Sequence, residues 1–351
     1  MYTKQPKKML IINILDILKK HTDENHRLSQ KDIISILKNE YNMTANRKAV
    51  RRNILDLIDF GYEIEYSEAV RMVPNAATGE LEESYIMSDF YLVRDFTDSE
   101  LRLLIDSLLF SKHIPYSQCK ELVDKLAGLS NKFFESHIKH IRTMPDTSPV
   151  NRQLFYTIEI LDEAISLGRK VSFTYNSYET DKKLHPRRRE DGTIRNYTVT
   201  PYQIAAANGR YYLICNHDKF DNVSNYRIDR ITDIKLLDSP ARAARDVRGL
   251  EGGIDLPRHM AEHIYMFAGE SEAVTFRVKK YMLNDIIDWF GKDIFFFDED
   301  DEEVTATVTV NVAAMRRWAL QYALHTKILS PEHLCRQIKE DLAAAARNYG
   351  L

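Results

Sequence analysis

Cysteine is scarce in this chain, whose 351 residues include three: Cys119, Cys215 and Cys335. They lie far apart in the sequence, so they form neither a Cys-x-x-Cys pair nor the even set that a disulfide framework needs. Such usage is typical of proteins kept in a reducing compartment. We therefore expect a cytoplasmic protein.

Long apolar segments and the short motifs of common enzymes are also missing. No apolar run reaches the roughly 18 residues that a membrane-spanning helix needs. Asn13 and Asp16 interrupt the lysine-rich start, so we expect residues 1–20 to form a helix rather than a signal peptide. The sequence has no P-loop, G-x-S-x-G or G-x-G-x-x-G motif. We expect no membrane partner, no cofactor and no catalytic activity.

Chain length and net charge limit the number of domains and the way in which the protein could bind nucleic acid. A chain of 351 residues exceeds one ordinary core and indicates about two to four modules. The formal net charge is −3, so the protein as a whole weakly repels an anionic polymer such as nucleic acid. Any nucleic-acid binding must therefore come from local basic patches.

Residues 1–95 have the pattern of three helices followed by a hairpin. Ser29 is placed to cap a second helix, and a third helix opens at Asn46 and ends at Gly61. Strands at 62–66 and 90–93 follow, separated by a long polar excursion. The apolar positions of the first helix recur with a helical period at Met9, Ile12, Leu15 and Leu18, and Ile11 and Ile14 widen this stripe. This order predicts a winged helix-turn-helix domain.

The third helix separates apolar residues from basic ones. Val50, Ile54 and Leu57 share one side, and cations project from the other. A basic helix face is often simply solvated, but the helix-turn-helix context favours contact with phosphates and base edges in the major groove. We expect duplex DNA to bind here, at Ser29, Asn46, Arg47, Lys48, Arg51 and Arg52.

The excursion between the two strands is acidic. It carries Glu80, Glu82 and Glu83, with Arg71 as the cation near its tip. We expect this wing to serve in packing or partner contact instead of DNA binding.

Residues 96–149 read as a helical connector. Thr97 and Glu100 form a capping box ahead of an apolar stripe, and a second helix covers 117–129. The apolar face must be buried against a second protomer or the next domain. We expect a homodimer, because one helix-turn-helix reads only half of an operator.

Residues 198–231 carry tyrosines and arginines on short strands. Asn208-Gly209 is a strong two-residue hairpin signal, because both positions tolerate positive φ. A third strand, 226–231, alternates and so places Arg227 and Arg230 on opposite faces. Alternation also predicts that Tyr211 is the core member of the Tyr211-Tyr212 pair.

This stretch resembles the WYL domain of bacterial transcriptional regulators. Residues 209–213 read Gly-Arg-Tyr-Tyr-Leu, with tyrosine in place of the tryptophan that names the family, and residues 226–231 read Tyr-Arg-Ile-Asp-Arg-Ile. The resemblance implies an Sm-like β-barrel over about 150–239 that senses a nucleotide or single-stranded nucleic acid. The ligand-binding positions that it implies are Tyr175, Tyr212, Arg227 and Arg230, to which we add His185 as a sequence neighbour.

Two further details near this site are expectations from the residues. Asp229 can hold an arginine in place as a bidentate partner. The basic run at 182–189 is the densest positive charge in the chain, and for Arg188 and Arg189 we favour a solvated loop.

The C-terminal region, 269–351, follows a linker at 240–268. Its strands and helices are predicted in the order βαββαβ with a last helix from Pro331, which is the ferredoxin-like arrangement. The region resembles the WCX extension of WYL regulators, and Leu329-Ser330-Pro331-Glu332 matches the entry to its final helix. The acidic turn at 298–303 reads as a solvated hairpin.

His259, Glu262 and His263 fit the H-x-x-E-H pattern of inverted zinc peptidases, in which two histidines share a helix face. The match is short and lies between two domains, and no third ligand is apparent. We expect it to be accidental and predict no metal site.

The sequence as a whole predicts a multidomain α+β protein. We expect it to be a ligand-responsive DNA-binding transcriptional regulator, with the winged helices reading an operator and the WYL domain sensing its effector. The alternative is an RNA-binding or nucleic-acid-sensing interaction protein that works through the Sm-like barrel.

Overall fold

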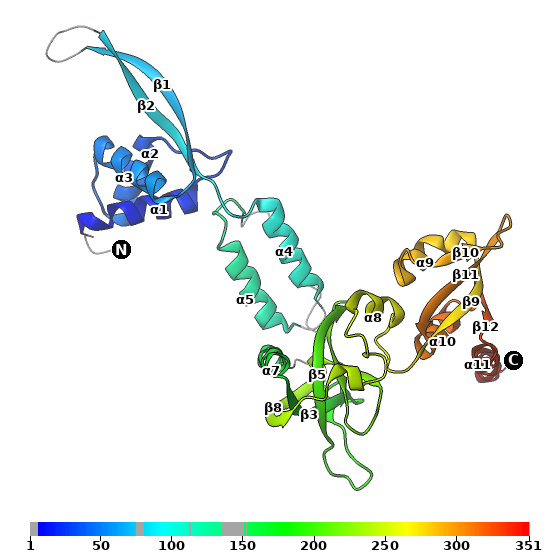
Figure 1. Ribbon diagram of the computed structural model, residues 1–351. Helices are drawn as coiled ribbons and strands as arrows, with labels where there is room; N and C mark the ends of the chain where they lie inside the picture. Colours follow the sequence, from blue (N-terminus) through cyan, green and yellow to red (C-terminus); the bar gives the residue numbers. More distant parts are fainter. Residues whose placement is uncertain (1–5, 75–80, 112–113, 135–150, 152, 351) are drawn as a thin grey trace. The chain divides into compact units, whose positions relative to one another are not determined.

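The computed structural model describes the chain except residues 1–5, 75–80, 112–113, 135–150, 152 and 351 (Figure 1). The fold is mixed α+β, with helices in the N-terminal part and several antiparallel sheets. It divides into two compact units, Met1–Thr147 and Ser148–Leu351, which are described separately. No helix in the described ranges is both long and apolar enough to cross a membrane.

The first unit begins with the short 3-10 helix η1 (Lys7–Met9) and three α-helices. These are α1 (Leu10–His21), α2 (Gln30–Tyr41) and α3 (Arg47–Phe60). Ser29 caps α2 in a capping box with Asp32, as the sequence predicts for its start. Asn46 caps α3, and Gly61 ends it at φ 115°.

The core of this helical group is apolar and close-packed. Ile14, Ile17 and Leu18 of α1 are fully buried, whereas Ile12 is 54% exposed. Ile14 and Leu18 are therefore buried as predicted, and Ile12 lies outside the buried stripe. Phe90 of the following hairpin closes the same core.

A long antiparallel ribbon follows, where the sequence predicts a polar loop between two short strands. Strand β1 (Ile64–Pro74) pairs with β2 (Leu81–Leu92), with a bulge between Glu65 and Ser67. The prediction was wrong in extent, because residues 64–74 and 81–92 pair with each other and so satisfy their backbone hydrogen bonds. The predicted wing tip at 75–80 lies outside the described residues.

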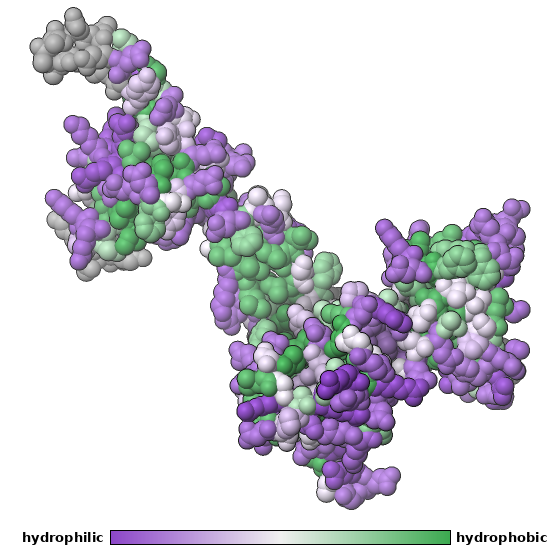
Figure 2. Space-filling model, in the orientation of Figure 1, coloured by the Kyte–Doolittle hydropathy of each residue, from purple (hydrophilic) through white to green (hydrophobic). Residues whose placement is uncertain are grey.

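Two helices, α4 (Asp98–Phe110) and α5 (Tyr116–Ala127), form the connector. Thr97 and Glu100 make the predicted capping box. Leu101 and Ile105 of α4 pack with Phe134. Figure 2 shows apolar surface over these helices. Leu103 and Phe110 of α4 are among the exposed apolar side chains.

The end of the connector is tied to the helical group through Asn131, which is 4% exposed. Its amide nitrogen donates to the Thr22 carbonyl at 3.2 Å and to Asp23 Oδ2 at 2.8 Å. Its amide oxygen accepts the backbone N–H groups of Phe133 and Phe134. All four hydrogen-bonding positions of one buried amide are thus used.

The second unit opens with α7 (Leu154–Leu167), which Gly168 ends at φ 60°. Six strands follow: β3 (Arg169–Tyr178), β4 (Leu184–Pro186), β5 (Asn196–Ala207), β6 (Arg210–Asn216), β7 (Val223–Arg227) and β8 (Ile231–Pro240). Hydrogen bonds give the order β8-β3-β5-β6-β7, with β4 on the end of β3. Among the described residues β7 and β8 are not paired, so the sheet is not a closed barrel.

The predicted hairpin and third strand have different outcomes. Asn208 and Gly209 join β5 and β6 at φ 51° and 71°, as the sequence predicts. The third strand stops at Arg227, because residues 228–230 form the 3-10 helix η2 (Ile228–Arg230). The two-residue alternation predicted for Arg227 and Arg230 is therefore wrong, since a 3-10 helix has about three residues per turn.

A linker with the 3-10 helix η3 (Ala244–Asp246) and α8 (Leu256–Glu262) leads to the C-terminal sheet. There β9 (Ser271–Lys279), η4 (Lys280–Met282), α9 (Leu283–Phe290), β10 (Phe295–Phe297), β11 (Glu303–Asn311), α10 (Val312–Gln321), β12 (Thr326–Ser330) and α11 (Glu332–Asn348) follow in turn. The antiparallel sheet has the order β10-β11-β9-β12. Trp318 packs edge-on against Phe290 and Phe276 in its core.

The acidic turn at 298–303 is more than a solvated hairpin. Arg277 of β9 forms ion pairs with Asp298, Asp300 and Glu303, and Lys279 pairs with Glu302. Strand pairing of β9 with β11 places these cations beside the turn.

Replacing Asn131 by alanine tests the tie between connector and helices. We expect the Asn131→Ala variant to lose about 2 to 4 kcal/mol of unfolding free energy, because several buried groups lose their partners. Urea denaturation followed by circular dichroism measures this, with exposed Asn39→Ala as the control. Equal losses in both variants would contradict the role of Asn131.

Candidate functional site

The basic face of α3 lies opposite its buried stripe. Val50, Ile54 and Leu57 are buried, while the four predicted cations are exposed: Arg47, Lys48, Arg51 and Arg52. No ion pair joins these four to another residue of the described part of the chain. Their charge is therefore open to an anionic partner.

Ser29 and Asn46, also predicted at the DNA surface, have capping roles. The Ser29 hydroxyl accepts the Asp32 backbone N–H, and Asn46 Oδ1 accepts the Ala49 backbone N–H at 2.8 Å. Their side chains thus position the two helix starts.

Four aromatic rings cluster where β3, β5 and β7 meet. Tyr226 contacts Tyr175 edge-on with ring centroids 4.9 Å apart, and it contacts Tyr197 and Phe173 at 5.5 Å. Phe173 stacks on Tyr197 at 5.8 Å. The side chains of Phe173, Tyr175 and Tyr197 are almost fully buried. The four rings thus form a packed and largely buried aromatic base.

Two arginines lie over rings of this group, and a third lies over the neighbouring Tyr178 ring. Arg187 is 5.0 Å from the centre of the Tyr175 ring, and Arg195 is 4.8 Å from that of Tyr197. Arg230 lies 5.5 Å from the Tyr178 ring, and its Nε is buried without a hydrogen-bond partner. These distances fit cation–π contacts, and we call Tyr175, Tyr197, Tyr226, Arg187, Arg195, Arg227 and Arg230 the arginine–tyrosine cluster.

Arg227 is held in place within this cluster. Its guanidinium donates to both carboxylate oxygens of Asp229, with Nε at 3.0 Å from Oδ1, and its backbone N–H donates to the Tyr175 hydroxyl at 3.3 Å. Burial lowers the pKa of Arg227, but hydrogen bonds and charge from Asp229 outweigh burial and raise it above its usual value. The structure thus has Asp229 as the expected bidentate partner of an arginine, which is Arg227.

Tyr175 is equally constrained. Burial raises the pKa of its phenol, against the opposing effects of the Arg227 N–H and the nearby guanidinium charges. The hydroxyl is therefore protonated at neutral pH, and it accepts a hydrogen bond from Arg227.

Tyr212 of β6 is the cross-strand partner of Arg227, and His185 lies on β4. Tyr212 is 9% exposed and packs with Ile214 and Met266 under the linker, whereas Tyr211 is only partly buried. The prediction that Tyr211 is the core member was wrong, because a distant segment covers the other face. His185 is 2.8 Å from Asp181 in the turn before β4.

Sequence reasoning missed Arg187, Arg195, Tyr197 and Tyr226 as site residues. Arg187 belongs to a basic run that resembles a solvated loop, yet its backbone N–H donates to the Tyr175 carbonyl at 3.0 Å. The pairing of β4 with the end of β3 creates this contact. The signal in the sequence that could have identified Arg187 is the short segment Leu184–Pro186 directly before it, which forms β4.

Comparison with known families matches residues 156–236 to the model described as "WYL domain". The chain contains a WYL domain. All members of the arginine–tyrosine cluster lie inside the matched range. Comparison with curated proteins gives no match.

Several solved structures are similar to the chain, including the following two. One is the proteasome accessory factor B/C (PafBC) of Arthrobacter aurescens, with 14% identity, a TM-score of 0.28, and coverage of 99% of this chain and 49% of that one. This chain thus spans about half the length of that protein. The other is titled a CRISPR Cas-related protein, with 12% identity, a TM-score of 0.39, and coverage of 100% and 88%.

The H-x-x-E-H residues lie on and just after α8. The His259 and His263 rings stack 4.1 Å apart, and Glu262 forms an ion pair with Arg258 at 2.7 Å. Burial lowers the pKa of His259 to about 4, so its imidazole is neutral at pH 7. Within the described ranges, no group of three or more metal-binding side chains is assembled.

The pairing of Arg227 with Asp229 can be tested by a double-mutant cycle. We expect a coupling of about 1 to 3 kcal/mol among Arg227→Ala, Asp229→Ala and the double variant, because each single change leaves a mostly buried charge unpaired. Urea denaturation of the four proteins gives the coupling. Additive losses would show that the two side chains act independently.

Proposed function

We propose that this protein is a ligand-responsive, DNA-binding transcriptional regulator whose WYL domain senses a nucleotide or single-stranded nucleic acid. In this proposal the N-terminal helices and ribbon form a winged helix-turn-helix, the WYL sheet is Sm-like, and the C-terminal sheet is ferredoxin-like. The arginine–tyrosine cluster is the observation that carries the effector assignment.

The basic face of α3 supports the DNA-binding part. Four exposed cations stand opposite a buried stripe on a helix that follows a capped partner helix. When cations without carboxylate partners neutralise DNA phosphates, the counterions condensed on the DNA are released, and this release drives binding. A homodimer would present two such helices to two half-sites. The ribbon carries exposed Glu65, Glu68 and Glu83, so we assign it to packing or partner contact rather than to phosphates.

The cluster supports the effector part by its chemistry. Guanidinium groups form bidentate hydrogen bonds with phosphate oxygens, and arginine planes stack on bases. The side chains of Arg187 and Arg195 are exposed above buried rings. Their guanidinium groups can therefore move from the ring to a ligand with a small loss of free energy. Arg227 is fixed by Asp229 and can orient a ligand without first being ordered.

A regulatory role, rather than catalysis, fits this assembly. The cluster combines recognition groups without a nucleophile and base in contact, and we assign it no reaction. Effector binding regulates DNA binding only by favouring one arrangement of the dimer.

The DNA surface is tested at Lys48 and Arg51. We expect Lys48→Ala and Arg51→Ala each to weaken binding to the operator and to lower the salt slope by about 1, because each removes one phosphate or base contact. The operator is first obtained by sequencing DNA that crosslinks to the protein. Lys120→Ala, an exposed change on α5, is the matched control. Unchanged affinity and slope in the folded α3 variants would refute the assignment.

The effector surface is tested at Arg195 and Arg227. We expect a short single-stranded oligonucleotide or AMP to change operator affinity of the wild type by about 5- to 150-fold, which corresponds to a coupling of 1 to 3 kcal/mol. Arg195→Ala and Arg227→Ala should lose this response. Arg169 lies at the opposite end of β3 from Tyr175 and pairs with Asp238 of β8. The Arg169→Ala variant should keep the response to the oligonucleotide.

Direct binding distinguishes the outcomes of that experiment. If both variants bind the oligonucleotide as the wild type does, the effector site lies elsewhere. If the oligonucleotide binds tightly at the cluster but operator DNA never binds, the protein is instead a nucleic-acid-binding interaction protein.

A further inference from the structure

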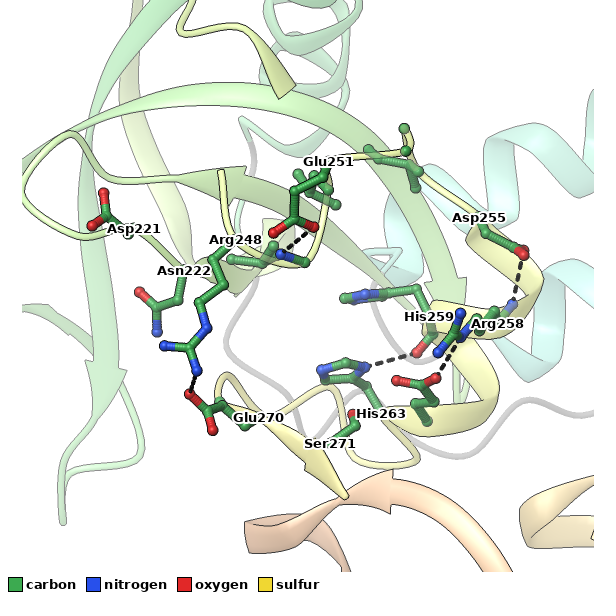
Figure 3. Close-up of a pocket in the computed structure, with 18 of the residues that line it drawn as sticks. Asp221, Asn222, Arg248, Glu251, Asp255, Arg258, His259, His263, Glu270 and Ser271 are labelled. Atoms are coloured by element: carbon green, nitrogen blue, oxygen red, sulfur yellow. Dashed lines mark hydrogen bonds and ion pairs between the residues drawn. The ribbon is translucent and has the colours of Figure 1, made fainter. Parts of the chain in front are cut away.

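A cavity lies away from the arginine–tyrosine cluster, where the linker passes between β7 and β9 (Figure 3). Its volume is about 810 Å³, which is the size of a small-molecule site rather than of an ion site. Three segments enclose it: the loop before β7, the linker through α8, and the start of β9, at 220–223, 248–263 and 269–271. All three belong to the second unit.

Two residues that line this cavity carry buried polar atoms without hydrogen-bond partners among the described residues. His259 Nε2 and Ser271 Oγ are buried and have no hydrogen-bond partner within the described structure. His263 is 9% exposed, and its Nδ1 is 2.9 Å from the His259 carbonyl oxygen. In the tautomer that donates through Nδ1, its Nε2 carries a lone pair on the ring edge that faces the cavity in Figure 3. Buried polar groups without partners indicate that a ligand or water supplies them.

The charge of the lining selects the ligand. Five carboxylates and two guanidinium groups line the cavity, so with neutral histidines its formal charge is 2 − 5 = −3. The carboxylates are Asp221, Glu251, Asp255, Glu262 and Glu270. Three of them are neutralised by ion pairs: Asp221 with Arg242, Glu262 with Arg258, and Glu270 with Arg248.

Two carboxylates remain without an ion pair among the described residues. Glu251 accepts the Gly249 backbone N–H at 3.0 Å, and backbone hydrogen bonds lower the pKa of its carboxyl, which is therefore ionised at neutral pH. Asp255 accepts the Arg258 backbone N–H at the start of α8. Figure 3 shows the Glu251 carboxylate directed into the cavity across from the two imidazole rings. A cation is favoured here and an anion is repelled.

We propose that this cavity binds a small organic amine of the diamine or polyamine class. An ammonium group pairs with Glu251 and donates to the acceptor atoms of His263 and Ser271, and a second ammonium lies near Asp255. A metal ion fits less well, because no three ligands are assembled among the described residues. This site is separate from the arginine–tyrosine cluster and does not depend on the proposed effector.

Isothermal titration of the full chain with spermidine tests the proposal. We expect saturable binding of one molecule, and a loss of affinity of about tenfold or more in Glu251→Gln, which removes one charge from an exposed side chain and keeps its shape. Glu159→Gln, an exposed change on α7, is the matched control for attraction to the protein's net charge and should bind as the wild type does. Ser271→Ala should weaken binding less than Glu251→Gln.

Three comparison probes decide the ligand class. Heptane-1,7-diol, which lacks charge, should not bind. The proposal is overturned if spermidine shows no saturable binding, or if Glu159→Gln weakens it as much as Glu251→Gln does. It is also overturned if AMP binds in its place with a dependence on Glu251, or if Zn²⁺ binds stoichiometrically and is lost in His263→Ala.

Discussion

The return of the chain from β7 to β8 is the constraint on which the WYL sheet depends. Strand β3 pairs with β5 on one edge and β8 on the other, so the chain must leave β7 and cross back. The 3-10 helix η2 makes this turn, and Asn176 and Asn151 donate to the carbonyls of Arg230 and Ile231 at its exit. Because the turn begins directly after Arg227, it also brings Arg227 to Asp229 and to Tyr175.

Signals that act within a few residues were readable from the sequence. The Asn208-Gly209 hairpin and the capping boxes at Ser29 and Thr97 depend on local backbone geometry, which the side chains there determine. The element order of the C-terminal region likewise follows from clear changes of hydrophobic period.

Features that depend on distant segments were not readable. Tyr212 is buried because Met266 of the linker covers its face of the sheet, and nothing near Tyr212 indicates this. Arg187 and Arg195 reach the rings only through the registers of β4 and β5 on β3. The strand alternation predicted for 226–231 was wrong because the two-residue period of a strand does not indicate where the strand ends and the chain turns toward the other edge of the sheet.

Strand β7 joins the two candidate ligand sites. Val223 at its start lines the acidic cavity, and Arg227 at its end belongs to the arginine–tyrosine cluster, with five residues between and including them. A cation at one end and an anion at the other would each contact the same short strand, which pairs with β6 along its length and ends in a 3-10 helix. Any coupling between the two sites would pass through this strand, and linkage requires its effect on binding to be equal in both directions.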